Sequence, residues 1–135
     1  MDGFGGRVGL HSESGKDGSS RIELDALEEH LNPSGTVHGG VLATLVDSAM
    51  GLAARSTTDD GGVPATSQLT VTYLRPGRPG PMVATAQVRK QGEHLLVCDA
   101  EVEQWARRWS TRSPRSPSSG TDPGGRHRRG DQARD

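Results

Sequence analysis

The sequence predicts an α+β fold in which an antiparallel sheet wraps around one long central helix. Residues 41–54 form an apolar run that is rich in Leu and Ala, which predicts the helix. Strand-like runs cover residues 21–26 and 65–74, on either side of that helix in the chain. Two more strand-like runs, 82–90 and 94–103, follow close together. Strands that follow one another across short turns favour antiparallel pairing.

The strands are predicted from residue patterns. Arg21–Ala26 alternates apolar and charged side chains, which is typical of a half-buried strand. Residues 65–74 are rich in Thr, Val and Tyr, and residues 75–81 hold three prolines and two glycines and therefore form a turn. Residues 82–90 and 94–103 flank Gln91–Gly92–Glu93, which predicts a hairpin.

The predicted helix, Val41–Ala54, is apolar on nearly all sides, which indicates a buried helix. Asp47 is the only charged side chain between His38 and Arg55. A carboxylate among apolar side chains is costly unless partners stabilise its charge, and such groups are often functional. The alternative is a structural aspartate that is hydrogen-bonded to backbone groups.

Composition divides the chain into three parts. Residues 1–20 are predicted to be a loop-rich leader, in which Phe4–Leu10 forms a short strand or a helical turn. Residues 21–104 form the folded domain. Residues 105–135 are dense in Arg, Ser, Pro and Gly without any period, and are predicted to be a disordered tail. The body, 1–104, holds 8 Lys and Arg against 14 Asp and Glu, whereas the tail holds 8 Arg against 3 acids.

Several classes of protein are disfavoured. One cysteine, Cys98, excludes an intramolecular disulfide and suits the cytoplasm, where we expect the protein to be located. Its apolar neighbours predict a buried core thiol. No stretch reaches the roughly 20 apolar residues of a membrane span, and residues 1–20 lack the apolar run of a signal peptide.

The segment before the helix carries the second candidate feature. His38–Gly39–Gly40 leads directly into the helix, where free backbone N–H groups can bind an anion or polarise a carbonyl oxygen. Glycine allows a substrate to approach the backbone closely. Asn32 lies six residues before His38 and could position a carbonyl group or a water molecule. A tight turn at the glycines and an Asx turn at Asn32 are the simpler readings of each feature alone.

Together these features resemble a known signature. Asn32 to Ala53 reads N-P-S-G-T-V-H-G-G-V-L-A-T-L-V-D-S-A-M-G-L-A. It resembles the hotdog thioesterases of the phenylacetic-acid-degradation type, which share N-P-x-G-x-x-H-G-G and then a helical Asp eight residues after the first glycine of the pair. Thr70–Pro76 resembles the strand and turn that follow. The resemblance covers roughly residues 21–103. It implies a hotdog fold and hydrolysis of an acyl-CoA thioester, with an aryl-acetyl or medium-chain acyl group.

The resemblance also implies roles for single residues. The Gly39 N–H would bind the thioester carbonyl oxygen. Asp47, from the partner subunit of a dimer, would act as general base or nucleophile. Asn32 and His38 would orient the thioester or its sulfur. Thr66 would position water, as a hydroxyl residue does in some relatives, although it could equally be an ordinary strand threonine.

The resemblance further implies a substrate-binding surface and an assembly. The candidates for substrate contact are Gly40, Arg75, Arg78, Arg89 and Lys90, with solvated surface charge as the alternative for the four basic side chains. No separate cofactor and no metal are expected, because CoA is part of the substrate. The implied partners are the acyl-CoA and further copies of the chain, in a homodimer or homotetramer. Neither nucleic acid nor a membrane is expected as a partner.

The chain departs from the family after residue 104. Such hotdog sheets have five strands in the spatial order 1-3-4-5-2, and the expected last strand is missing here. Its loss would open a gap inside the sheet. One hypothesis is that the tail is an out-of-frame reading that begins near Gln104 or Trp105, which resequencing of the gene would test. Another is that Trp105–Arg112 fills the gap as an improvised strand.

Three other functions stay open. The protein could bind acyl-CoA without hydrolysing it, or could be inactive because its last strand is missing. The basic tail could bind nucleic acid, but Trp105 and Trp109 are its only aromatic side chains for stacking on bases.

Overall fold

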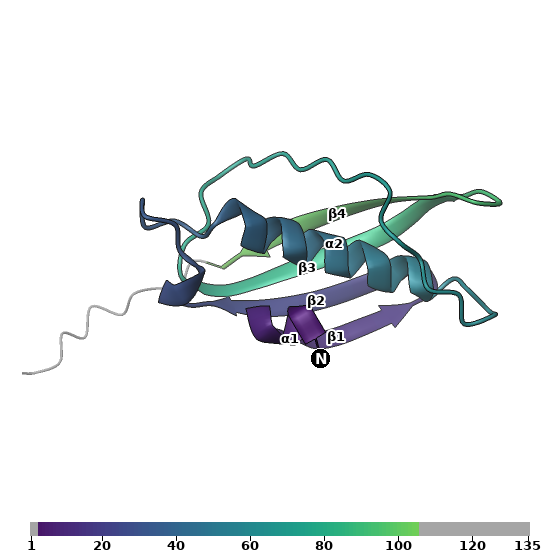
Figure 1. Cartoon of the computed structure of the whole chain (residues 1–135), viewed down its shortest axis with the longest axis horizontal. Helices are drawn as coiled ribbons and strands as arrows, with labels where there is room; N and C mark the ends of the chain where they lie inside the picture. Colours follow the sequence, from purple (N-terminus) through teal and green to yellow (C-terminus); the bar gives the residue numbers. More distant parts are fainter. Residues whose placement is uncertain (1–2, 106–135) are drawn as a thin grey trace, which may run out of the picture.

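The structure, a computed structural model, describes residues 3–105. Its elements follow the order helix, two strands, a short helix, a long helix and two strands. They are α1 (Gly3–Val8), β1 (Leu10–Lys16), β2 (Ser19–Ala26), the 3-10 helix η1 (Glu28–His30), α2 (Gly39–Arg55), β3 (Gly80–Gln91) and β4 (Leu96–Gln104). The four strands form one antiparallel sheet in the order β1-β2-β3-β4, and α2 lies across one face of it (Figure 1). This confirms the predicted fold class.

The first strand corrects the prediction of a loop-rich leader over residues 1–20. α1 provides the helical turn that was one of the two readings of Phe4–Leu10, and β1 pairs along β2. The connection is a two-residue turn at Asp17 and Gly18, with φ angles of 51° and 78°. Two positive φ angles are typical of a type I′ turn, whose twist matches that of antiparallel strands. The Asp-Gly dipeptide was therefore the sequence signal for this hairpin.

The core lies between α2 and the sheet. Leu45, Ala49 and Ala53 are fully buried on the helix, and Ile22 and Leu24 face them from β2. Met82, Ala84 and Ala86 contribute from β3. The helix is two residues longer at its start than predicted and ends one residue later. It is not buried all round, because Val41, Leu42, Met50 and Leu52 are only half-buried within one chain.

The C-terminal hairpin confirms the predicted pair of strands, with partners from Met82↔Gln104 to Gln91↔Leu96. The prediction of a strand over residues 65–74 is wrong. Residues 61–79 run along α2 without regular structure, and within the described residues no strand pairs with them (Figure 1). An extended chain becomes a strand only when a neighbour satisfies its N–H and C=O groups. Here β4 ends the sheet on that side, so no such neighbour is described.

The predicted disordered tail lies outside the described residues, apart from Trp105. The proposed strand at Trp105–Arg112 is therefore also outside them. Among the residues that the structure describes, no helix is long and apolar enough to span a membrane.

Replacement of Leu45 by Ala tests the position of the core. Leu45 is 0% exposed, so truncation leaves a cavity between α2 and the sheet, and we expect the free energy of unfolding to fall by about 2–5 kcal/mol. Val97→Ala, at a side chain that is 47% exposed on β4, should cost far less. Urea denaturation measures both variants. Equal losses of unfolding free energy in the two variants would show that Leu45 is not buried between α2 and the sheet.

Candidate active site

The N-terminus of α2 has a backbone N–H group, that of Gly39, for which the described residues supply no partner. His38 is the N-cap, and its Nδ1 accepts a hydrogen bond from the Gly40 N–H at 2.9 Å. The Val41 and Leu42 N–H groups both donate to the His38 carbonyl oxygen. Within the described part of the chain, the Gly39 N–H has no partner and is left to bind an external acceptor. The Gly40 N–H, by contrast, is already used by the cap.

The loop before α2 is held by Asn32, which uses its side chain within the loop. Its Oδ1 accepts hydrogen bonds from the Ser34 N–H at 3.0 Å and the Thr36 N–H at 3.3 Å. Its Nδ2 donates to the Thr36 hydroxyl oxygen at 2.8 Å. This is the Asx turn expected as the simpler reading. In one chain, therefore, Asn32 shapes the loop, and one of the two N–H groups on its Nδ2 has no partner among the described residues.

His30 anchors this loop to the rest of the fold. The side chain is buried, its Nδ1 accepts from the Leu27 N–H at 2.8 Å, and its Nε2 lies 2.7 Å from the Val8 carbonyl oxygen. The carbonyl oxygen of His30 accepts from the His38 N–H at 2.8 Å. α1 and the start of α2 are thus tied to one buried residue.

The carboxylate of Asp47 lies on the half-buried side of α2 and has one hydrogen-bond partner among residues 3–105. The Thr66 hydroxyl donates to its Oδ1 at 2.6 Å, and Thr66 itself is exposed. The two residues come from the helix and from the extended segment 61–79. The structure thus places the Thr66 hydroxyl on the Asp47 carboxylate, whereas the strand predicted to carry Thr66 is absent. A carboxylate oxygen remains free to accept a proton.

Gly39 and Asp47 do not meet within one chain. They are eight residues apart on the same helix, which corresponds to about 12 Å along its axis. For hydrolysis, the carbonyl oxygen of the thioester must lie about 3 Å from the N–H donor. The water that attacks the same carbonyl group must lie about 3 Å from the base. Within one chain, therefore, the Gly39 N–H and the Asp47 carboxylate cannot act on the same carbonyl group.

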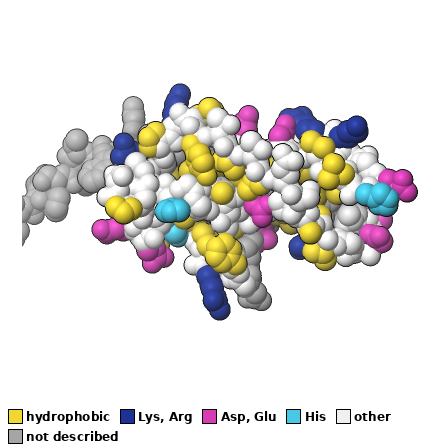
Figure 2. All heavy atoms as spheres, turned by 45° about the horizontal axis from the view of Figure 1, so that its top comes forward, with side chains coloured by type: hydrophobic (Ala, Val, Ile, Leu, Met, Phe, Trp, Pro, Cys, Tyr) yellow, Lys and Arg dark blue, Asp and Glu magenta, His cyan; other side chains and the backbone are white. Residues whose placement is uncertain are grey.

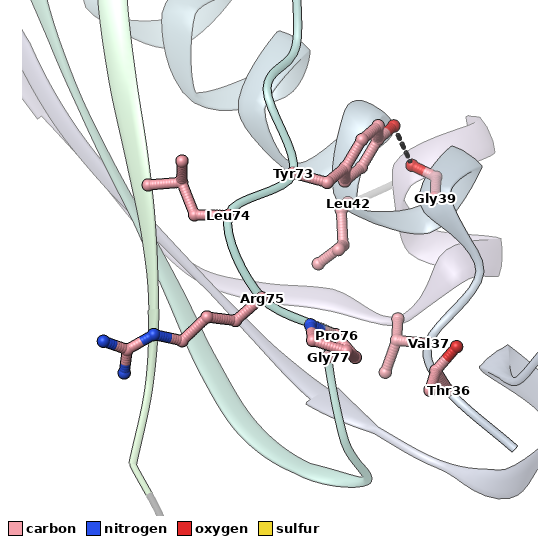
Figure 3. A pocket seen from close by; sticks show the side chains of 9 residues that line it. All are labelled: Thr36, Val37, Gly39, Leu42, Tyr73, Leu74, Arg75, Pro76 and Gly77. Atoms are coloured by element: carbon pink, nitrogen blue, oxygen red, sulfur yellow. Dashed lines mark hydrogen bonds between the residues drawn. The ribbon is translucent and has the colours of Figure 1, made fainter.

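A cavity of about 300 Å³ opens beside Gly39, between the helix start and the segment around residue 75. Figure 3 shows the Tyr73 ring over the first turn of α2, where its hydroxyl donates to the Gly39 carbonyl oxygen at 2.8 Å. Sequence reasoning missed Tyr73 as a site residue. Its only signal was its position in the run Thr70–Pro76.

The basic candidates lie in two separate places. Arg75 lines the cavity, with its side chain directed away from Gly39 (Figure 3). Arg78 lies near the same end of β3, while Arg89 and Lys90 are at the other end, nine or ten residues from Gly80 and so about 30 Å away. Arg89 also forms an ion pair with Asp99 at 2.6 Å. The four side chains therefore do not form one cluster within a chain.

Cys98 is a further side chain that could react, and a metal ion is a further group that a site could hold. Burial raises the pKa of the Cys98 thiol, and the neighbouring Asp99 charge adds to the effect, so Cys98 stays protonated and is a poor nucleophile near neutral pH. Among the described residues, no three His, Cys, Asp or Glu side chains are placed to share a metal ion.

Comparison with known proteins places the chain in a family. The thioesterase superfamily matches residues 34–105, which is more than half of the chain. The chain belongs to this superfamily. The matched range holds four of the five catalytic candidates, Gly39, His38, Asp47 and Thr66, and begins two residues after Asn32.

Several proteins that are similar in sequence to this chain are named as thioesterases or esterases. The acyl-coenzyme A thioesterase PaaI of Escherichia coli is 34% identical over 96 residues, which are 70% of this chain and 66% of the relative. The human acyl-coenzyme A thioesterase 13 is 40% identical over 82 residues, 59% of this chain and 57% of the relative. A putative esterase of Halobacterium salinarum is 38% identical over 100 residues and is covered to 66%. The chain thus spans somewhat under two thirds of these relatives.

Solved structures confirm the hotdog architecture that the resemblance implied. The conserved protein PA5202 of Pseudomonas aeruginosa superposes with a TM-score of 0.70 at 32% identity, covering 77% of this chain and 83% of that one. The E. coli PaaI protein of the phenylacetic acid degradation operon gives a TM-score of 0.66 at 33% identity, with 73% of each chain covered.

The Tyr73 contact can be tested by replacing Tyr73 with Phe. This removes the donor to the Gly39 carbonyl and keeps the ring, so we expect a loss of about 0.5–1.5 kcal/mol in the free energy of unfolding. Faster amide hydrogen exchange at Val41 and Leu42, measured by NMR, should accompany it because the first turn frays. Thr72→Val, at an exposed neighbour, is the control. Unchanged exchange in Tyr73→Phe would contradict a role in holding this turn.

Proposed function

We propose that the protein is an acyl-CoA thioesterase that hydrolyses a thioester to a free acid and CoA. The observation that carries the proposal is the pair of half-sites on α2. One is an unpaired N–H at the helix start, and the other is a carboxylate with a hydroxyl partner two turns further along. Both are what thioester hydrolysis needs, and the relatives that match this region are named as acyl-CoA thioesterases.

The chemistry assigned to the two half-sites is hydrolysis through a tetrahedral intermediate. The Gly39 N–H, helped by the dipole of α2, binds the carbonyl oxygen as negative charge develops on it. Asp47 removes a proton from a water molecule whose oxygen attacks the carbonyl carbon, and the Thr66 hydroxyl orients the carboxylate or the water. The C–S bond then breaks, and the CoA thiolate takes up a proton. Direct attack by the carboxylate is the variant route.

A complete site requires two copies of the chain. Because Gly39 and Asp47 are about 12 Å apart on one helix, the Asp47 that serves a given Gly39 comes from a partner chain. The half-buried apolar side chains of α2 support this arrangement, since a second copy would cover them. We propose a homodimer as the smallest active form, with a tetramer as a pair of such dimers. His38 and Asn32 then belong to the Gly39 half-site.

The substrate is proposed to lie along the surface between the two copies. Arg75, which lines the cavity beside Gly39, is the best placed cation for a CoA phosphate. Gly40 and Arg78 are near the same end of the molecule, whereas Arg89 and Lys90 would serve only through the second copy. CoA enters as part of the substrate, no further cofactor is needed, and a cytoplasmic location fits a CoA-dependent reaction. The acyl group is proposed to be aryl-acetyl or medium-chain.

Replacement of Asp47 by Asn separates hydrolysis from binding. The amide cannot take a proton from water, so we expect kcat with phenylacetyl-CoA or octanoyl-CoA to fall by a factor of about 10²–10⁴, with KM little changed. Thiol release measures the rate, and Ser48→Ala on the same helix is the control. A native chain that binds acyl-CoA but never hydrolyses it would favour the binding function instead. A chain that does not fold would point to the missing last strand.

Mixing two inactive variants tests the shared site. Gly39→Pro removes the N–H at the first helical position, where proline fits the helix backbone and His38 already has a compatible ψ of 132°. Its added Cβ would lie 3.1–3.2 Å from the Tyr73 side chain, which must shift, and the same holds for alanine. Gly39→Ala, which keeps the N–H, is its control. If each site takes Gly39 from one chain and Asp47 from the other, mixed Asp47→Asn and Gly39→Pro chains should recover about a quarter of wild-type activity. No recovery after exchange of subunits would show that each chain forms its site alone.

A further inference from the structure

Two exposed arginines, Arg75 and Arg78, lie in a short loop beside the Gly39 half-site. This loop, residues 75–78, comes at the end of the extended segment, just before β3. Neither arginine forms an ion pair with an acidic side chain among residues 3–105. The basic side chains on the face over which the segment runs are spread out and do not form one patch (Figure 2). Binding of a phosphate group on this face therefore depends on where single guanidinium groups are held.

The first part of the loop is tied to the start of α2. The Val37 N–H donates to the Gly77 carbonyl oxygen at 2.9 Å, and the Tyr73 hydroxyl donates to the Gly39 carbonyl oxygen at 2.8 Å. Gly77 is buried, and a Cβ at this position would lie 3.0 Å from two neighbouring side chains, so glycine allows the close approach. Arg75 therefore lies between two contacts with the chain around the Gly39 half-site.

The last part of the loop is held by a different element. Gln104 is half-buried at the end of β4, and its side chain makes two hydrogen bonds to the backbone of Arg78. Its Oε1 accepts from the Arg78 N–H at 2.8 Å, and its Nε2 donates to the Arg78 carbonyl oxygen. A side-chain amide that binds the N–H and the C=O of one residue reproduces the pairing of two antiparallel strands. Gln104 thus holds the backbone from which the Arg78 guanidinium extends.

The backbone of Arg78 has no other hydrogen-bond partner among the described residues. Pro79 follows it and has no N–H group to donate. Loss of the Gln104 amide would therefore release the Arg78 backbone. The bond between Val37 and Gly77 would still hold the part of the loop that lies next to the helix start. A change at Gln104 can thus move Arg78 without moving the Gly39 half-site.

We propose that Gln104 is a positioning residue that holds Arg78 against a phosphate group of the CoA part of the substrate. The inference rests on the proposed function, because acyl-CoA is the ligand that carries the phosphates. A guanidinium group binds a phosphate through two parallel N–H donors, so its contribution depends on its position and direction as well as on its charge. Gln104 belongs to neither half-site. It therefore affects how tightly CoA is bound and not the reaction at the thioester.

Replacement of Gln104 by Met tests the proposal, because methionine has a similar length and removes both hydrogen bonds. We expect KM for octanoyl-CoA to rise roughly three- to tenfold, as for the loss of one or two hydrogen bonds, with kcat within about twofold. S-octanoyl-N-acetylcysteamine has the same thioester but no phosphate, so its KM should not respond. Gln87→Met makes the same change at an exposed position on β3 and should alter KM for neither substrate.

A double-mutant cycle tests whether Gln104 acts through Arg78. Arg78→Met removes the guanidinium group and should also raise KM for octanoyl-CoA. The addition of Gln104→Met to Arg78→Met should then change KM by less than about twofold, because the group that Gln104 positions is gone. Arg78→Met alters only an exposed side chain, so it tests the phosphate contact even if Gln104→Met lowers the stability of the fold. An unchanged KM in Arg78→Met would overturn the proposal.

Binding of CoA itself, measured by isothermal titration calorimetry, separates this inference from the proposed activity. If the chain binds CoA and Gln104→Met raises the Kd by the factor expected for KM, the inference stands even when no thioester is hydrolysed. If acyl-CoA is hydrolysed but Gln104→Met behaves as Gln87→Met does, the thioesterase activity stands and the inference fails.

Three further results would overturn the proposal. An equal rise in KM for octanoyl-CoA and for the truncated thioester would give Gln104 a role in the fold alone. Independent effects of Gln104→Met and Arg78→Met, which multiply in the double variant, would show that Gln104 does not act through Arg78. A folded, unsubstituted chain that binds no CoA would leave Arg78 without the ligand proposed for it.

Discussion

Close contact between α2 and the sheet is the constraint on which the rest of the molecule depends. The contact is built from small side chains, with Ala49 and Ala53 on the helix and Ala84 and Ala86 on β3, all at most 2% exposed. Small side chains bring the helix backbone near the sheet, so that the Ser20 hydroxyl on β2 donates to the Ala49 carbonyl oxygen at 2.6 Å. Because α2 carries both the free N–H and the catalytic carboxylate candidate, this one interface positions both half-sites.

The sequence predicts well those helices and strands in which the spacing of apolar residues reflects which side chains are buried. The apolar run at 41–54 and the alternation in residues 21–26 reflect the core directly, and the hairpin of β3 and β4 has its own turn signal. β1 was missed because it is rich in polar residues, and only the Asp17–Gly18 turn marks it. Residues 65–74 have strand-like composition, but composition does not supply a backbone partner.

The candidate site was predictable only where a motif carried it. The family resemblance pointed to Gly39, Asp47 and Thr66, and the structure does place the Thr66 hydroxyl on the carboxylate across 19 positions in the chain. The Tyr73 contact with Gly39 joins residues 34 positions apart, and neither periodicity nor spacing reports such a pair. The separation of Arg75 and Arg78 from Arg89 and Lys90, by contrast, follows from the strand predicted over residues 82–90, because nine or ten residues of strand span about 30 Å.

The bulge in β1 has a consequence for assembly. Pairing between β1 and β2 is interrupted between His11 and Ser14, and Ser12 has a φ of 53° at that point. The exposed charges of Glu13 and Lys16 follow on the same strand. Irregular, charged edges resist pairing with a further strand. The sheet therefore has two unlike edges, a regular one at β4 and an irregular, charged one at β1, and this difference disfavours open-ended stacking of sheets edge to edge.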